Sequence, residues 1–235
     1  MTLADDPQID LEVGPEDVLQ NLLEMRYSCR AFQHRRVPRP TIRRILELAQ
    51  RSPSWCNTQP WEVFVTEGAG TERFRTAISA FAAKNPPCPD LSFPERYEGI
   101  FQHRRRECGW QLYESVGIEH GDRVASAAQM QRNFTLFNAP HVAIITTERD
   151  LGVYGALDCG VYLSGFLLAA QSLGVSAIPQ AALAAVAPAV RDQLQLPDHR
   201  QVLYGVSFGY SDHQHPANHF RTTRAEIEDV VSWIS

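Results

Sequence analysis

Hydrophobic residues along this chain recur with two spacings, which predict alternating helices and strands. Apolar positions three and four residues apart predict helices at 14–25, 40–51, from 71 onward, 107–116, 122–137, 153–173, 188–194 and 225–233. Short β-branched runs predict strands at 62–66, 141–147, 175–178 and 202–209. This order predicts an α/β (α+β) fold, a three-layer sandwich whose helices cover both faces of a central mixed sheet of four or five strands.

Two segments depart from ordinary amphipathic patterns. Residues 85–105 are rich in proline and aromatic side chains, and we expect an ordered, irregular excursion that lies over a pocket. Residues 153–173 are apolar nearly all round, but Asp158, Gln171 and the lack of a basic flank argue against a membrane span. In a soluble chain such a helix is buried on every side, so we expect its second face to lie in the interface of an obligate homodimer.

The composition is that of an ordinary globular protein. The 235 residues are 44% hydrophobic and 21% charged, which fits one domain over 14–235 after an acidic, flexible leader at 1–13. The formal net charge of -5 gives no general attraction to nucleic acid or to an anionic membrane. The leader lacks the apolar region of a secretory signal, and the five cysteines form no C-x-x-C pair, so we expect a cytoplasmic protein with free thiols.

The sequence RYSCR at residues 26–30 is a candidate phosphate site. In an extended stretch alternate residues point the same way, which brings Arg26, Ser28 and Arg30 together. Two guanidinium groups and a hydroxyl suit a phosphate, because arginine offers planar, charge-assisted hydrogen bonds. Taken alone, the segment is also compatible with arginines on a solvated surface.

Two further polar segments carry candidate chemistry. Residues 52–61 form a loop dense in amides, hydroxyls and tryptophans, which offers the donors, acceptors and flat surface that a flavin ring requires. The alternative is a capping turn that tucks Trp61 into the core. Arg221 and Arg224 precede the predicted C-terminal helix, whose N-terminus also favours anions, although solvated charge explains them equally simply.

The sequence resembles the nitroreductase family. The segments RYSCRAF, VPRPTIRRILELAQRSPSWCNTQPWEVFV, GVSAIPQAALA and NHFRTTR occur in the order seen in that family, and the similarity runs over residues 24–231. The wording SWCNTQPW and IPQAALA resembles the branch that contains nitrobenzoate and dinitroaniline nitroreductases. The resemblance implies a nitroreductase-like, domain-exchanged homodimer that binds FMN and takes electrons from NADPH or NADH.

The resemblance also implies which residues bind the cofactor. In the family, the Arg-x-Ser-x-Arg segment binds the FMN phosphate and ribityl chain, and the P-S-x-x-N loop approaches the same flavin from the partner subunit. The proline-led segment after the central helix lines the isoalloxazine with backbone groups, and a C-terminal basic pair lies near the phosphate. The residues implied here are, in that order, Arg26, Tyr27, Ser28 and Arg30; Pro53, Ser54, Trp55 and Asn57; Pro179, Gln180, Ala181 and Ala182; and Arg221 and Arg224.

The pocket for the substrate is less clearly marked. Many relatives have glutamate and glycine where this chain has Ala181 and Ala182, so any role of that carboxylate is absent here. In the excursion, Tyr97, Phe101 and His103 are candidates to contact a nicotinamide or an acceptor.

The expected function is NAD(P)H-dependent reduction of nitroaromatic compounds to nitroso and hydroxylamine products by a ping-pong mechanism, with quinone-like compounds as further acceptors. The resemblance implies that flavin N5 carries the chemistry, so we expect no catalytic acid or base. A flavin, quinone or ene-reductase on the same scaffold, and a non-catalytic flavin-binding protein, remain alternatives. The histidines near residue 215 lack cysteine partners, and no metal site is predicted.

Overall fold

A computed structural model describes residues 14–235, and a four-stranded sheet with the order β1-β2-β4-β3 lies at its centre. The strands are β1 (Glu62–Val65), β2 (His141–Glu148), β3 (Ser176–Gln180) and β4 (Arg200–Gly209). Four strands were predicted, but the prediction of a mixed sheet needs correction, because all three strand pairs are antiparallel. The segment that joins β3 to β4 turns the chain back on itself, and the parallel pairing among the described residues is the isolated bridge Ser28–Ala177.

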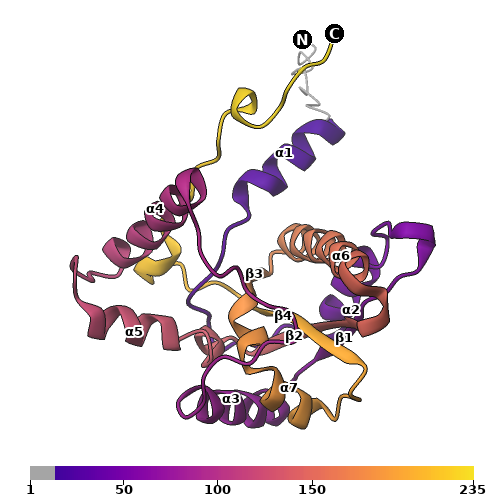
Figure 1. The fold of residues 1–235 in the computed structure, drawn as a ribbon, viewed down its shortest axis with the longest axis vertical. Helices are drawn as coiled ribbons and strands as arrows, with labels where there is room; N and C mark the ends of the chain where they lie inside the picture. Colours follow the sequence, from indigo (N-terminus) through magenta and orange to yellow (C-terminus); the bar gives the residue numbers. More distant parts are fainter. Residues whose placement is uncertain (1–13) are drawn as a thin grey trace, which may run out of the picture.

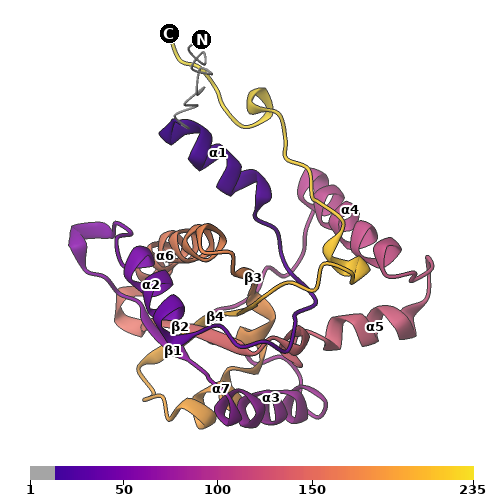
Figure 2. The same cartoon turned by 180° about the vertical axis from the view of Figure 1, so that it is seen from behind.

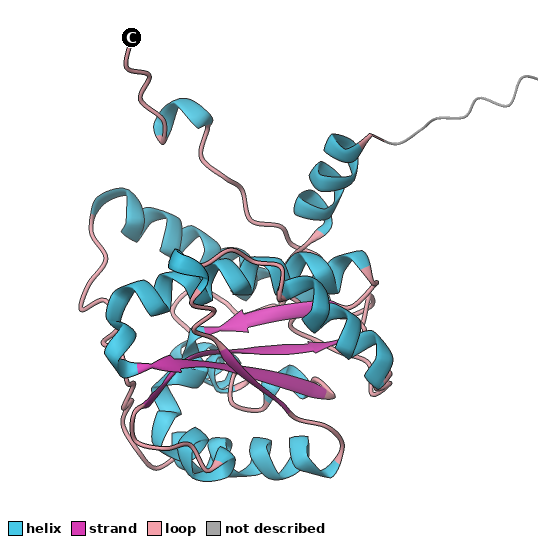
Figure 3. Ribbon diagram, turned by 90° about the vertical axis from the view of Figure 1, so that its right-hand side faces the viewer, coloured by secondary structure: helices cyan, strands magenta, loops and turns pink. Residues whose placement is uncertain are grey.

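Helices cover both faces of this sheet, as the sequence predicted, and give three layers (Figure 3). On one face lie α2 (Arg39–Ala49) and α6 (Gly152–Ser172), and on the other lie α3 (Ala69–Ala82) and α7 (Ala187–Leu194). Successive residues of β2 alternate between the two cores: Ala143 packs with the α2–α6 layer and Ile144 packs with the α3–α7 layer. With a core on each side of the sheet, β2 is buried along nearly its whole length.

The sequence of the central helix α6 is apolar nearly all round, but only one of its faces is buried in this chain. By length and composition alone, the helical stretch 149–172 could cross a membrane: its most apolar 18 residues have a mean hydropathy of 1.5, and 33% of these residues are buried. One face is buried against α2 and the sheet through Cys159, Tyr162 and Phe166. The opposite face leaves Val153, Leu157 and Val161 exposed within the described chain.

Helix α4 (Gly99–Ser115) begins well before the predicted position, so the expected irregular excursion is wrong from residue 99 onward. The last proline of that region is Pro94, and the residues after Gly99 favour helix without one to stop it. Helix α5 (Arg123–Gln131) is shorter than predicted, because the apolar residues Leu136 and Phe137 reach the core through a left-handed turn instead of a longer helix.

The two ends of the described chain project from the body on the same side (Figures 1 and 2). One is α1 (Pro15–Met25), which has no buried residue, and the other is the C-terminal segment after residue 220. The predicted helix at 225–233 is wrong: only a short turn, Ile227–Asp229, forms there, and Trp233 is 85% exposed. Most side chains of this stretch are exposed within residues 14–235, and an amphipathic stretch this short gains too little from so little burial to offset its ordering. The predicted leader, 1–13, lies outside the described residues.

Candidate functional site

Two segments from opposite ends of the chain are bound to each other at the edge of the sheet beside β3. Asn218 connects them, because its Oδ1 accepts a hydrogen bond from the Arg30 backbone N–H at 2.7 Å and its Nδ2 donates to the Ala31 carbonyl at 2.9 Å. The Tyr27 hydroxyl and the Ser211 Oγ lie 2.6 Å apart, which adds a second connection. These contacts place residues 26–31 directly against residues 211–224.

The two segments enclose a cavity of about 590 Å³ beside them. Its wall includes all six of the residues predicted near the FMN phosphate: Arg26, Tyr27, Ser28, Arg30, Arg221 and Arg224. Helix α4 contributes Cys108, and α1 contributes Leu23 and Glu24. The structure therefore brings together four guanidinium groups that lie nearly two hundred residues apart in sequence; we call this the cationic cavity.

The electrostatics of the cationic cavity suit a doubly charged anion. Burial lowers the pKa of Arg26, and the nearby positive charge of Arg224 lowers it further. Burial also lowers the pKa of Arg30, whose Nη1 donates to the Ser28 carbonyl at 3.1 Å. Within residues 14–235 the Arg26 guanidinium has no hydrogen bond or ion pair, so its donors are free for a ligand. A phosphate dianion would relieve this repulsion, and the residues fit the phosphate end of FMN.

Aromatic rings fix the position of two of these arginines. The Arg221 guanidinium carbon lies 3.8 Å from the centroid of the Tyr27 ring, and that of Arg30 lies 5.4 Å from the centroid of Phe220. Stacking of this kind restricts a guanidinium without consuming its hydrogen-bond donors. The resemblance alone predicted that Arg221 and Arg224 lie near the phosphate, and both of them line the cationic cavity.

The segment Pro179–Ala182 lies close to this cavity through the bridge between Ser28 and Ala177. It forms the end of β3 and the start of the short helix η4 (Ala181–Val186). η4 packs so closely on β4 that a Cβ placed on Gly205 would clash with Leu183 Cδ1, and this buried leucine would have to shift to admit any other residue. Ala181 is exposed, whereas the Gln180 side chain is 2% exposed and points into the protein.

The predicted loop residues Pro53, Ser54, Trp55 and Asn57 lie elsewhere in the same chain. Their loop, between α2 and β1, lies on the opposite side of the molecule from α4 and α5 (Figure 1). The Trp55 backbone N–H donates to the Asp158 carboxylate at 3.1 Å, and its ring packs 4.7 Å from that of Tyr154 on α6. The structure thus joins this loop to the exposed face of α6 and does not join it to the cationic cavity of its own chain.

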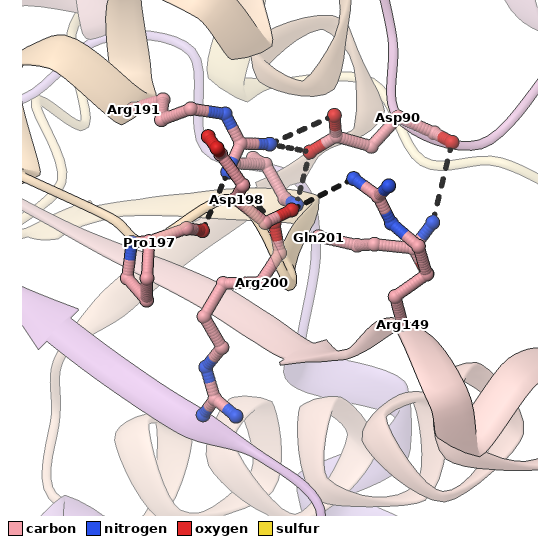
Figure 4. Close-up of polar contacts among 8 residues, drawn as sticks. Asp90, Arg149, Arg191, Pro197, Asp198, Arg200 and Gln201 are labelled. Carbon is pink, nitrogen blue, oxygen red and sulfur yellow. Dashed lines mark hydrogen bonds and ion pairs between the residues drawn. The ribbon is translucent and has the colours of Figure 1, made fainter.

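A partly buried ion pair holds the beginning of the excursion in place (Figure 4). The Asp90 carboxylate accepts hydrogen bonds from Arg191 Nη2 at 2.8 and 2.9 Å, and from the Val202 backbone N–H at 2.7 Å. The Cys88 backbone N–H donates to the Ala185 carbonyl at 2.8 Å. Residues 88–90 are therefore tied to α7, β4 and η4, and the excursion is ordered at this end, as predicted.

The predicted substrate residues fall into two groups. His103 lines a second cavity of about 490 Å³, together with Arg104 and Glu107 of α4 and residues 222–225. Cys108, Thr222 and Arg224 line both this cavity and the cationic cavity, so the two are neighbours. Tyr97 and Phe101 do not form part of its wall and are 42% and 65% exposed.

Two contributors to the site could not have been chosen from sequence. Asn218 is the first residue of the motif NHFRTTR, but the motif does not indicate whether its amide is buried between two segments or exposed at the surface. Cys108 follows the basic run of α4 and gave no signal of its own. Across residues 14–235, no group of three or more histidine, cysteine or acidic residues is arranged to hold a metal ion.

Comparison with known proteins finds relatives that match nearly the whole chain. The chain is 33% identical over 231 residues to Nitroreductase NfnB of Mycolicibacterium smegmatis, covering 98% of this chain and 97% of that protein. It is 33% identical over 241 residues to a 4-nitrobenzoate reductase of Nocardioides sp., covering 94% and 96%. The crystal structure of the FMN-dependent nitroreductase NfnB from Mycobacterium smegmatis in complex with NADPH superposes with a TM-score of 0.90 at 31% identity, covering 94% of this chain and 100% of that one.

The family model described as Nitroreductase family matches residues 23–210, which include both sides of the sheet and most of the site. The resemblance inferred from the sequence motifs is thus confirmed, and the chain belongs to the nitroreductase family.

Proposed function

We propose that this chain is an FMN-dependent, NAD(P)H-oxidising nitroreductase that acts on small nitroaromatic acceptors. The observation that carries the proposal is the convergence of Arg26, Arg30, Arg221 and Arg224 on one cavity. In a chain of net charge -5, four guanidinium groups gathered from both ends, none of them in an ion pair with a carboxylate of residues 14–235, are best explained by an anionic ligand.

The chain's own residues would bind and orient FMN. The cationic cavity and the Ser28 hydroxyl would hold the phosphate and ribityl chain, while the backbone of Pro179–Ala182 would face the ring. When bound, FMN supplies a two-electron carrier between the nicotinamide and the acceptor. The protein's part is to orient both reactants at the ring and to exclude water, and we assign no side-chain acid or base.

We propose that the active form is a homodimer built on the exposed face of α6. Val153, Leu157 and Val161, spaced by four residues, are 66%, 58% and 44% exposed, beside Tyr154 at 55%. An apolar stripe of this size on a core helix is typical of a subunit interface. Because the Trp55 loop packs against the same face, a second copy docked there would bring its own Trp55 loop across the interface.

The donor and acceptor would use the second cavity and the space beside it. The matched structure from Mycobacterium smegmatis contains NADPH, and the relatives include nitrobenzoate, nitrobenzene and chloronitrobenzene reductases. His103 and Arg104 line the cavity next to the phosphate position, where anionic or aromatic groups of either reactant would be received. Tyr97 and Phe101 would lie at its margin. The five free cysteines are compatible with action in the cytoplasm.

The decisive test is anaerobic. Purified protein should take up FMN and become yellow, lose its colour on addition of NADPH or NADH, and regain it on addition of 4-nitrobenzoate or nitrobenzene. Initial rates should give parallel double-reciprocal lines, as ping-pong kinetics requires. Reoxidation by free flavin or a quinone but by no nitroarene would favour another reductase on this scaffold, and a yellow protein that no nicotinamide bleaches would favour a flavin-binding protein without catalysis.

The dimer is tested separately by sedimentation. The wild-type chain should sediment as a dimer, and Leu157→Arg should yield monomers because the partner subunit would then have to bury a charge in place of the leucine at the centre of the stripe. Arg44→Glu changes the charge of an exposed residue on α2 and is the matched control, which should stay dimeric. A wild-type chain that remains monomeric at all concentrations contradicts this part of the proposal.

A further inference from the structure

We infer that Gln180 is a positioning residue: its buried side-chain amide holds the backbone at Ala181 and Ala182 in the geometry that sets the reduction potential of the bound flavin. This inference rests on the proposed function. Gln180 is the last residue of β3 and directly precedes η4, so it lies at the bend in the chain where the strand ends. The family resemblance assigned this segment only backbone contacts.

The side chain of Gln180 is fully committed to the protein interior. It is 2% exposed, and its Oε1 accepts a hydrogen bond from the Ser207 hydroxyl at 2.5 Å. Its Nε2 donates to the backbone carbonyl of Asn133 at 2.9 Å and to the Asn133 Oδ1 at 3.2 Å. With both ends of the amide occupied, Gln180 has one side-chain orientation, and this amide is not available to contact a ligand directly.

The partner of Gln180 belongs to a turn that also touches the phosphate segment. Arg132, next to Asn133 at the end of α5, directs its Nη2 at the Arg30 carbonyl, 3.5 Å away, and its Nη1 lies 3.4 Å from His215 Nε2. Burial lowers the pKa of Arg132. Two adjacent residues, Arg132 and Asn133, thus connect the segment at the phosphate with the segment at the ring.

Backbone geometry matters at Ala181 and Ala182 because their side chains offer no polar group to a ligand. Ala181 and Ala182 offer only amide N–H and carbonyl groups, and these project from a chain whose direction is fixed at Gln180. Hydrogen bonds from a preorganised backbone stabilise whichever flavin state carries more negative charge at the contact. If the Gln180 amide is lost, the two alanines can relax, and the relative affinity for oxidised and reduced flavin changes.

The experiment compares Gln180→Met with a control that breaks an equally buried hydrogen-bonding side chain elsewhere. Methionine preserves length and removes the bonds to Ser207 and Asn133. In the control, Thr71→Val, the lost hydroxyl lies 2.9 Å from Thr66 Oγ1 and donates to the Pro140 carbonyl at 3.0 Å, in a residue 1% exposed. Both variants should lose stability, so a purely structural role predicts the same flavin properties in both.

The readouts are the midpoint potential and visible spectrum of the FMN-loaded protein, and amide hydrogen exchange of the flavin-free chain. Gln180→Met should change the ratio of affinities for reduced and oxidised FMN about tenfold, which is about 30 mV for a two-electron couple. It should also speed amide exchange at residues 181–183. Thr71→Val should leave the midpoint potential and the visible spectrum at their wild-type values, and should not speed amide exchange at residues 181–183 more than in the rest of the sheet.

A Gln180→Met holoprotein with wild-type potential, spectrum and amide exchange overturns the inference. Should that variant not fold, Ser207→Ala removes one of the three hydrogen bonds and should shift the potential in the same sense by a smaller amount; no shift there overturns the inference equally. A wild-type chain that takes up no FMN would instead contradict the proposed function, so the two failures are distinguishable.

Discussion

Replacing Arg26 by methionine separates ligand binding from folding more cleanly than any other change in the cationic cavity. The guanidinium is half-buried, repelled by Arg224, and has no hydrogen bond or ion pair within residues 14–235. Methionine keeps a long apolar side chain in contact with the cavity wall. Removing the charge therefore costs the folded chain little, and it deprives a bound phosphate of one charged donor.

The size of the effect follows from the contact that is lost. A hydrogen bond to a charged group contributes about 1.5–3 kcal/mol, and about 1.4 kcal/mol corresponds to a tenfold change in affinity. Arg26→Met should therefore raise the Kd for FMN about tenfold to a hundredfold. The assay is quenching of FMN fluorescence on titration with flavin-free protein, repeated at several salt concentrations, together with urea unfolding of the flavin-free chain.

Arg39→Met is the matched control for this change. It removes the same charge from a side chain that is 84% exposed at the start of α2, and it should leave the Kd for FMN unchanged. The flavin-free Arg26→Met chain should unfold at the wild-type urea concentration or above it, because the repulsion from Arg224 is gone. Equal FMN affinity in Arg26→Met, Arg39→Met and wild type would refute the assignment of the cationic cavity to the phosphate.

Three further outcomes are expected. Asn218→Leu removes the amide that joins the two chain ends, so FMN binding measured by the same titration should weaken at least tenfold and Tm should fall. Burial lowers the pKa of His141, and its Nε2 accepts a hydrogen bond from the Val37 N–H, so the folded ring is neutral. Stability should be complete above its ordinary pKa of 6.5 and decline as pH falls below it, a slope that His141→Gln should reduce in urea titrations between about pH 7.5 and 5.5. Asp90→Asn removes the carboxylate that pairs with Arg191, so it should lower Tm and expose residues 91–98 to proteolysis while the affinity for FMN stays unchanged.

The fold could be predicted from sequence where burial imposes a clear period. The stripe on α2 and the β-branched run of β2 report their own packing, because each has a core on the side that its apolar residues mark. The predictions failed where a segment's structure depends on contacts elsewhere. The turn at Leu136–Asn138 holds three consecutive residues at positive φ, and neither Leu136 nor Phe137 has a local preference for that conformation. The C-terminal stretch 225–233 has the spacing of a helix, but most of its side chains are exposed among residues 14–235.

The candidate site shows the same division. The residue types near 26 and 221 suited an anion but were equally compatible with solvated charge, and their position in family motifs favoured the phosphate. Their convergence is a tertiary fact, produced by the hydrogen bonds of Asn218 and the pairing of Ser28 with Ala177. Tyr97 and Phe101 were chosen for residue type alone, and in the structure they lie outside the wall that His103 helps to form.

Because the cationic cavity and the Trp55 loop lie apart in one chain, the proposed dimer divides the contacts to each FMN between its two chains. All the arginines come from one chain, whereas the loop lies beside the exposed face of α6, so a monomer keeps the phosphate contacts and loses those from the partner. Monomeric Leu157→Arg should therefore still bind FMN, weakly and in competition with inorganic phosphate, while the dimer binds it tightly. Competition by inorganic phosphate measures the contribution of the cationic cavity alone, because inorganic phosphate has no ring that could contact the Trp55 loop. Monomers that bind FMN as tightly as the dimer would show that the loop contributes nothing, and monomers with no phosphate-sensitive binding would show that the arginines do not form a site within one chain.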